Sequence, residues 1–183
     1  MFKIERIPVA DVPRALQLFS ETLADDWLVA PDVICKMVGP EFTDSEACLL
    51  GVYQGEELVG CINVLPWYQA LRHHKIGVAR LLDLYFLQEK IEEPAFVGGL
   101  AVRHDCRRQG LAKALLQEAE KVAKNEFDAD CFLAVTAKCE DDQTWPLGYA
   151  AATHLGLREI PDDFQCGDRV SQDLQLVWLL KDI

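Results

Sequence analysis

The segment from residue 95 to residue 137 constrains the fold most, because two apolar runs flank one strongly amphipathic helical pattern. Residues 95–102 and 131–137 are short, apolar and bounded by polar stretches, as buried strands are. Between them, residues 111–124 repeat apolar side chains at helical spacing. A strand, a helix and a second strand in this order predict a βαβ unit.

The remaining periodicities place this unit in a larger α/β domain. Further strands are predicted over residues 2–7, 47–53, 58–65 and 174–180, and further helices over residues 12–23, 31–38 and 145–155. The turn-forming residues Gln54-Gly55-Glu56-Glu57 join two of these strands into an antiparallel hairpin. Gly156 closes the last helix. We therefore expect one domain over residues 1–183, with a mixed sheet and helices on both faces.

Charge excludes one class of partner. The chain of 183 residues carries 18 basic and 30 acidic residues, for a net charge of −12. Such a surface repels polyanions, so nucleic-acid binding is not expected. No apolar run approaches the roughly 18 uncharged residues of a spanning helix, and residues 1–6 lack the apolar core of a signal peptide. We expect a cytoplasmic protein that does not bind membranes.

The cysteines and histidines do not predict a metal site. Seven cysteines are spread through the chain, no two of them in a C-x-x-C pair. An odd number among apolar neighbours indicates small buried side chains in a reducing compartment. His73 and His74 are adjacent rather than one helical turn apart. No metal ligand is assigned.

Residues 66–94 form a connection that is too long for a hairpin. The segment contains nine apolar residues between 76 and 87, distributed nearly all the way round a helix. We predict a helical insertion. It either adds a helix to the core, or covers the sheet edge or cleft, or meets a second subunit in a homodimer.

A short basic loop connects the strand at residues 95–102 to the following helix. Between Arg103 and Lys113 there are four basic residues and one acidic residue, a local charge of +3 within an acidic chain. The backbone N–H groups at the start of the helix after Gly110 have no partner inside the helix, and the helix dipole adds positive potential there. This segment predicts an anion site suited to phosphates.

The same loop carries a family resemblance. Arg107-x-x-Gly110-x-Ala112, following Leu100-x-Val102, resembles the Q/R-x-x-G-x-G/A signature of the GCN5-related N-acetyltransferases (GNAT). The resemblance covers roughly residues 2–181 and implies a mostly antiparallel central sheet, in which strands 95–102 and 131–137 splay apart to admit acetyl-CoA. The implied cofactor-binding residues are Leu100, Ala101, Val102, Arg107, Arg108, Gln109, Gly110, Leu111 and Ala112.

The resemblance also implies an activity. Acetyl-CoA would donate its acetyl group to a primary amine of a small molecule or peptide, by direct attack of the amine on the thioester. Backbone N–H groups around Leu100 and Ala101 could bind the carbonyl oxygen. Gly98 and Gly99 mark either the strand bulge that opens this site or positions of close packing. The alternative is a non-catalytic sensor or interaction module that binds acyl-CoA.

The proton-transfer groups depart from the family pattern. Relatives commonly carry a tyrosine four residues before the glycine that ends the last helix, but Ala152 occupies this position here. Tyr149 lies one turn earlier and is the predicted catalytic acid, or else an aromatic residue packed on the sheet. Glu93, with Glu92 beside it, is the predicted base, or else part of a solvated loop.

The acceptor is constrained only by charge. Residues 125–173 contain three basic and eleven acidic residues. This field favours a cationic acceptor, or it serves only to keep the protein in solution.

Overall fold

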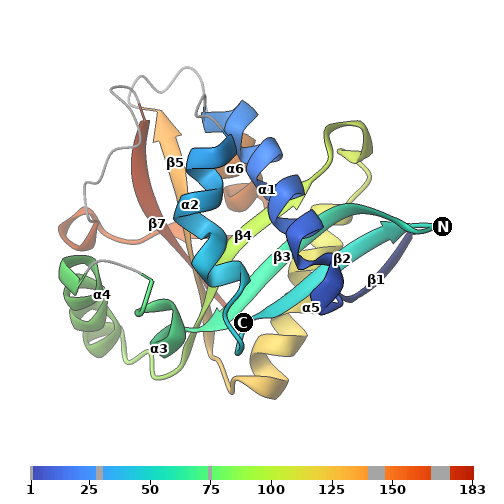
Figure 1. Ribbon diagram of the computed structural model, residues 1–183. Helices are drawn as coiled ribbons and strands as arrows, with labels where there is room; N and C mark the ends of the chain where they lie inside the picture. Colours follow the sequence, from blue (N-terminus) through green and yellow to red (C-terminus); the bar gives the residue numbers. More distant parts are fainter. Residues whose placement is uncertain (1, 28–30, 74–75, 140–146, 166–173) are drawn as a thin grey trace.

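A computed structural model describes residues 2–27, 31–73, 76–139, 147–165 and 174–183 (Figure 1). Its sheet has the order β1-β2-β3-β4-β5-β7-β6, and β4–β5 is the one parallel pair among the described strands. The strands are β1 (Phe2–Arg6), β2 (Cys48–Gln54), β3 (Glu57–Pro66), β4 (Pro94–Val102), β5 (Cys131–Cys139), β6 (Arg158–Glu159) and β7 (Leu174–Asp182). The prediction of a mixed, mostly antiparallel sheet is confirmed.

Helices cover both faces of the sheet. They are α1 (Val12–Trp27), α2 (Pro31–Phe42), α3 (Trp67–Ala70), α4 (Ile76–Glu89), α5 (Leu111–Glu126) and α6 (Leu147–His154). Helices α1 and α2 lie side by side on one face, and α5 packs on the other (Figure 1). None of the described helices combines the length and the apolar run that a bilayer span requires.

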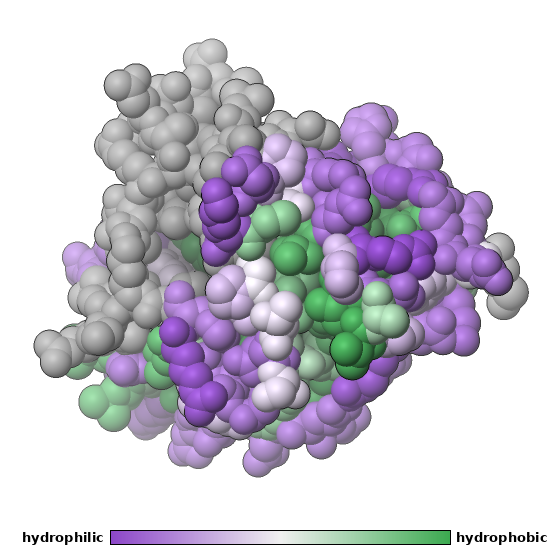
Figure 2. All heavy atoms as spheres, viewed as in Figure 1, coloured by the Kyte–Doolittle hydropathy of each residue, from purple (hydrophilic) through white to green (hydrophobic). Residues whose placement is uncertain are grey.

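Helix α2 is longer than the sequence predicts. It continues through Pro40 to Phe42, although proline removes one backbone hydrogen bond from the helix. Phe42 is buried, and the centroid of its ring lies 5.2 Å from that of Phe19 on α1. This aromatic contact offsets the local cost of Pro40 and holds the last turn of α2 against α1. On the face that Figure 2 shows, apolar side chains gather over the first part of α1 and are bordered by hydrophilic ones.

Strands β4 and β5 separate partway along the sheet. They pair from Pro94–Cys131 to Val97–Ala134 and no further. Beyond that point β4 continues to Val102, while β5 pairs with β7 along its whole length. The prediction that these two strands splay apart is confirmed, and it leaves one edge of β4 without a strand partner.

The two glycines of β4 form a bulge where the strands separate. Asn63 on β3 pairs with Gly99 and Val64 pairs with Val97, so Gly98 is the extra residue. A Cβ atom on Gly99 would lie 2.5 Å from the Phe19 ring. Both readings of this glycine pair therefore hold, because the bulge turns two successive residues toward the closely packed helices α1 and α2.

The segment between β3 and β4 contains α3 and α4. Several of its aromatic and aliphatic side chains join a buried cluster with residues of β4, β5 and β7, and these are Trp67, Ala70, Leu82, Tyr85 and Phe86. Its outer side carries Leu84 and Leu87, which are 59% and 78% exposed. The insertion thus contributes to the core and also leaves apolar side chains on the surface.

The last helix, α6, ends as its sequence predicts, at Gly156 with a φ of +92°. Its predicted start at Trp145 lies outside the described residues.

Candidate functional site

The loop between β4 and α5 has the geometry of an anion site. Gly110 precedes the first turn of α5 with a φ of +78°, and no side chain caps the helix. The first helical hydrogen bond runs from the N–H of Ala114 to the carbonyl of Gly110, 3.0 Å apart. The N–H groups of Leu111, Ala112 and Lys113 therefore point out of the helix end. A Cβ on Gly110 would meet no described atom within 4 Å, so the space beside this residue is open.

The arginines of this loop have different roles. Nε of Arg107 donates to the carbonyl of Val102 at 3.1 Å and ties the loop to the end of β4. Arg103 pairs with Asp105, Nε to Oδ1 at 2.6 Å, and with Glu57 on β3. Because Glu57 lies far away in sequence, the count of local charge overstated the positive field from Arg103. Arg108 and Lys113 are exposed, so these two residues and Arg107 supply the positive charge at the start of α5.

Glu93, the predicted base, lies at the other end of β4. It is exposed and precedes the first residue of β4, where β4 and β5 are still paired. Its carbonyl accepts from the N–H of Asp130 at 3.1 Å, while the neighbouring N–H of Glu92 donates to Oδ2 of Asp130. Five strand steps, about 16 Å, separate Glu93 from the bulge at Gly98. Its role as base stays a prediction, and this position does not support direct contact with an acetyl group at the bulge.

Tyr149, the predicted acid, belongs to α6, which contacts both β5 and α1. Its backbone is helical, and its side chain lies outside the part of the chain that the structure describes. Ala152, at the position of the family tyrosine, is half-buried against the core cluster on the α5 side of the sheet. The role of Tyr149 stays a prediction.

Two buried polar side chains that the sequence did not single out meet at the bulge. Glu41, in the last turn of α2, is 5% exposed, and Asn63 on β3 is fully buried. A Cβ built on Gly98 would lie 2.4 Å from Oε2 of Glu41 and 3.0 Å from Nδ2 of Asn63. Burial raises the pKa of Glu41 to about 8. We refer to Glu41 and Asn63 as the bulge pair.

One sequence signal could have found part of this pair. Asn63 is the single polar residue in the apolar run 58–65, on a strand that must be buried on both faces. A lone amide in such a strand needs a partner or a ligand. Glu41 carries no such signal, because only the packing of α2 on the sheet brings it to β4.

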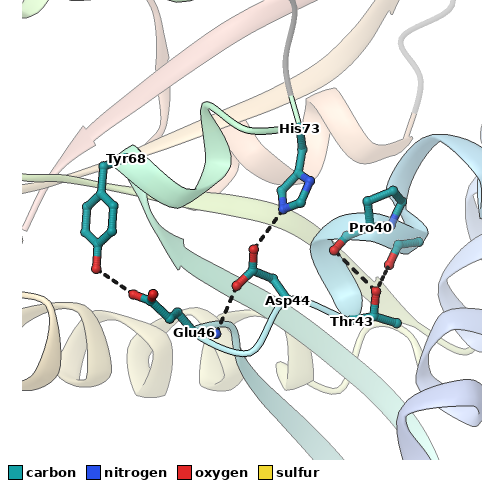
Figure 3. A network of polar contacts seen from close by, with 7 residues as sticks. Pro40, Thr43, Asp44, Glu46, Tyr68 and His73 are labelled. Carbon is teal, nitrogen blue, oxygen red and sulfur yellow. Dashed lines mark hydrogen bonds and ion pairs between the residues drawn. The ribbon is translucent and has the colours of Figure 1, made fainter.

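A polar network holds the loop that follows α2 (Figure 3). Nε2 of His73 lies 2.9 Å from Oδ2 of Asp44, and Oδ1 of Asp44 accepts the N–H of Glu46 at 2.9 Å. The hydroxyl of Tyr68 donates to Oε2 of Glu46 at 2.6 Å. The N–H of Glu46, and then His73, lower the pKa of Asp44. These contacts join the loop after α2 to α3 and the residues that follow it.

The described cysteines behave as packing residues. Cys48, Cys61, Cys106 and Cys131 are buried and free, and burial raises the pKa of Cys61 to about 12. Within the described ranges, no group of three His, Cys, Asp or Glu side chains is placed to hold a metal ion.

Comparison with known proteins agrees with this geometry. The sequence profile of the acetyltransferase (GNAT) family matches residues 12–147. No curated protein sequence matches the chain.

Solved structures of several acetyltransferases are similar along the whole chain. The PaiA N-acetyltransferase from Thermoplasma acidophilum, in complex with coenzyme A, is 12% identical with a TM-score of 0.62, over 100% of this chain and 99% of its own. The ribosomal-protein-S18-alanine N-acetyltransferase from Escherichia coli is 13% identical with a TM-score of 0.61, over 100% and 94%. A GNAT acetyltransferase from Elizabethkingia anophelis, with acetyl-CoA bound, is 15% identical with a TM-score of 0.55, over 100% and 98%.

Proposed function

The chain belongs to the GNAT family of acetyltransferases, and we propose that it transfers the acetyl group of acetyl-CoA to a primary amine. The observation that carries this proposal is the open, uncapped start of α5 beside the edge of β4 that β5 leaves free. The first feature suits a pyrophosphate, and the second suits an extended arm that lies along a strand. Together they fit the two chemically different parts of coenzyme A.

We assign the pyrophosphate to the loop from Arg107 to Ala112. Backbone N–H groups at the start of α5 would donate to phosphate oxygens, and Gly110 leaves room for their close approach. Arg108 and Gln109 are exposed beside these donors. Arg107 holds the loop in place through Val102 and adds positive charge.

We assign the pantetheine arm and the acetyl group to β4. The part of β4 beyond its last pair with β5 has no strand partner on that edge, and it contains Leu100, Ala101 and Val102. Backbone N–H groups near Leu100 and Ala101 would bind the carbonyl oxygen of the thioester as it gains negative charge. Bound acetyl-CoA supplies the activated acyl group for attack by the amine.

Tyr149 is proposed to protonate the thiolate that leaves. Its helix, α6, packs on β5, which is one of the two separated strands, and on α1, which contacts the other, β4. Tyr149 lies about one helical turn before the position of the family tyrosine, which Ala152 occupies in this chain. From there its phenol could reach the sulfur and donate a proton to it.

The acceptor is proposed to be a cationic primary amine on a small molecule or peptide, because the acidic surface attracts such molecules and repels nucleic acid. We also propose that the enzyme acts in the cytoplasm. A homodimer through Leu84 and Leu87, the exposed leucines of α4, is one assembly that we propose for it.

Calorimetry of acetyl-CoA binding tests the site. Arg107→Glu and Gly110→Asp should each weaken affinity at least tenfold, roughly 1.4 kcal/mol, because each brings a carboxylate to the phosphates. Gly110→Asn is the matched control, since asparagine tolerates the same positive φ and carries no charge. Equal affinities in the Gly110→Asp and Gly110→Asn variants would contradict the assignment.

An acyl-CoA sensor is the second candidate, because the family tyrosine is replaced by Ala152 while the cofactor loop is intact. Tight acetyl-CoA binding without acetylation of any amine in a panel of polyamines, aminoglycosides and basic peptides would favour the sensor.

A further inference from the structure

We propose that Glu41 is the base that takes the proton from the acceptor's ammonium group, and that Asn63 holds the amine beside it at the bulge of β4. This assignment rests on the proposed acetyl transfer and names the acceptor end of its active site. It gives the bulge pair a function that neither the family signature nor the cofactor loop assigns.

The first support is convergence from three elements. Glu41 comes from α2, Asn63 from β3 and Gly98 from β4, and the two side chains approach the same Cα atom. Gly98 is also the residue at which β4 loses β5 as a partner. Residues 94–97 of β4 are buried, whereas Gly98 is partly exposed. The bulge pair therefore lies against the residue at which β4 first becomes partly exposed to solvent.

The second support is the state of the Asn63 amide. Its side-chain nitrogen and oxygen are both buried, and neither has a hydrogen-bond partner among the described residues. A buried amide without partners costs free energy that an apolar side chain of similar size would not. An amine at the bulge would satisfy the oxygen of this amide, because the amine N–H donates to Oδ1 of Asn63.

The third support is that, among the residues that the structure describes, β4, β3 and the end of α2 offer no competing base at the bulge. Over Pro94–Val102, β4 carries no titratable side chain. On β3, Cys61 is two residues before Asn63, and its thiol contacts the carbonyl of Ala15. After α2, Asp44 is already paired with His73. Glu41 is the carboxyl group of α2 that packs against the bulge. Burial raises its pKa to about 8, which is near the pH at which a general base must act.

Acetyl transfer at this site moves two protons and one acetyl group. The carboxylate of Glu41 takes one proton from the ammonium group, and the neutral amine's lone pair attacks the thioester carbon. The C–N bond forms, the C–S bond breaks, and the sulfur leaves with the bonding electron pair. The second N–H proton of the attacking nitrogen ends on this thiolate, and Glu41 returns its proton to water.

Glu41→Gln tests the base, because it keeps the shape of the side chain and removes only its basicity. Two probes of similar shape separate base chemistry from packing: ethylamine, which is protonated at neutral pH, and trifluoroethylamine, which is mostly neutral there. With ethylamine, Glu41→Gln should lower kcat/KM by about 100-fold or more. With trifluoroethylamine, the loss should be less than about tenfold, since no proton has to be removed before attack.

Glu41→Asp and Asn63→Leu are the companion variants. Glu41→Asp keeps a carboxylate and should recover part of the ethylamine rate. Asn63→Leu should raise KM for the amine by roughly tenfold or more, the loss of one hydrogen bond in a buried site, and leave acetyl-CoA affinity unchanged. Equal losses with both amines in Glu41→Gln would show a structural role and overturn the assignment of the base.

The assignment and the proposed function fail in different ways. An active parent enzyme whose Glu41→Gln variant is equally active with ethylamine overturns the base and leaves the transferase standing. A parent that binds acetyl-CoA but acetylates neither probe, nor any amine of the panel, overturns both.

Discussion

Glu41 should make the stability of the fold depend on pH, and Glu41→Gln should remove that dependence. In the unfolded chain the carboxyl has its ordinary pKa of 4.5, and in the folded protein burial raises it to about 8. The folded state therefore binds the extra proton between these values. The contribution of Glu41 to the free energy of unfolding is fully present below pH 4.5, and it is lost as the pH rises through 8.

The magnitude follows from the difference between the two pKa values. Each pKa unit is worth about 1.4 kcal/mol, so the full effect of the Glu41 shift approaches about 5 kcal/mol. Between pH 5 and pH 8, the parent should lose roughly 3 to 4 kcal/mol of unfolding free energy relative to Glu41→Gln. That is a large part of the stability of a typical domain, on the order of 5–15 kcal/mol.

Urea unfolding followed by fluorescence of the buried Trp67 and Trp178 measures this difference at each pH. The control is Glu93→Gln, which removes an exposed carboxyl and should keep the parent's dependence on pH. If the parent and Glu41→Gln lose stability in parallel from pH 5 to pH 8, Glu41 is not held in a desolvated site and the reasoning is refuted.

Three further substitutions test separate parts of the account. Tyr149→Phe should lower turnover about 100-fold in a thiol-release assay and leave acetyl-CoA affinity unchanged, whereas unchanged turnover would assign the proton to solvent or another group. Gly99→Ala should destabilise the fold by roughly 1–3 kcal/mol in urea unfolding, because the new Cβ would lie 2.5 Å from the Phe19 ring, and an unaffected midpoint would contradict this packing. Asn63→Leu should leave stability unchanged or raise it, since it removes two unpartnered polar atoms, and a clear loss of stability would show that the amide has a structural partner.

The loop to which we assign the cofactor could be proposed from the sequence because its signal is local. Arg107, Gly110 and Ala112 occur within six residues, between a strand and a helix that are both evident from periodicity. The splaying of β4 and β5 was expected from the family resemblance and not from the residues themselves. The glycine pair pointed to the bulge, but only the register with β3 shows that Gly98 is its extra residue.

The bulge pair could not be predicted, because 22 residues and a change of secondary structure separate Glu41 from Asn63, and tertiary packing alone joins them. Tertiary packing also hid the partner of Arg103, because its charge is offset by Glu57 on the neighbouring strand β3. Glu93 was favoured as a base from its position beside β4, yet the strand rise places it far from the bulge.

Amine-dependent release of coenzyme A thiol, with mass spectrometry of the amine product, tests the central claim most directly. Saturating acetyl-CoA and a panel of polyamines, aminoglycosides and basic peptides should give thiol release that saturates with at least one amine and matches its acetylation mole for mole. At subsaturating acetyl-CoA, the rate should fall further in Gly110→Asp than in Gly110→Asn, because only the first variant adds a negative charge. Thiol release that no amine accelerates, or acetylation that is equal in these two variants, would contradict an acetyltransferase site at the start of α5.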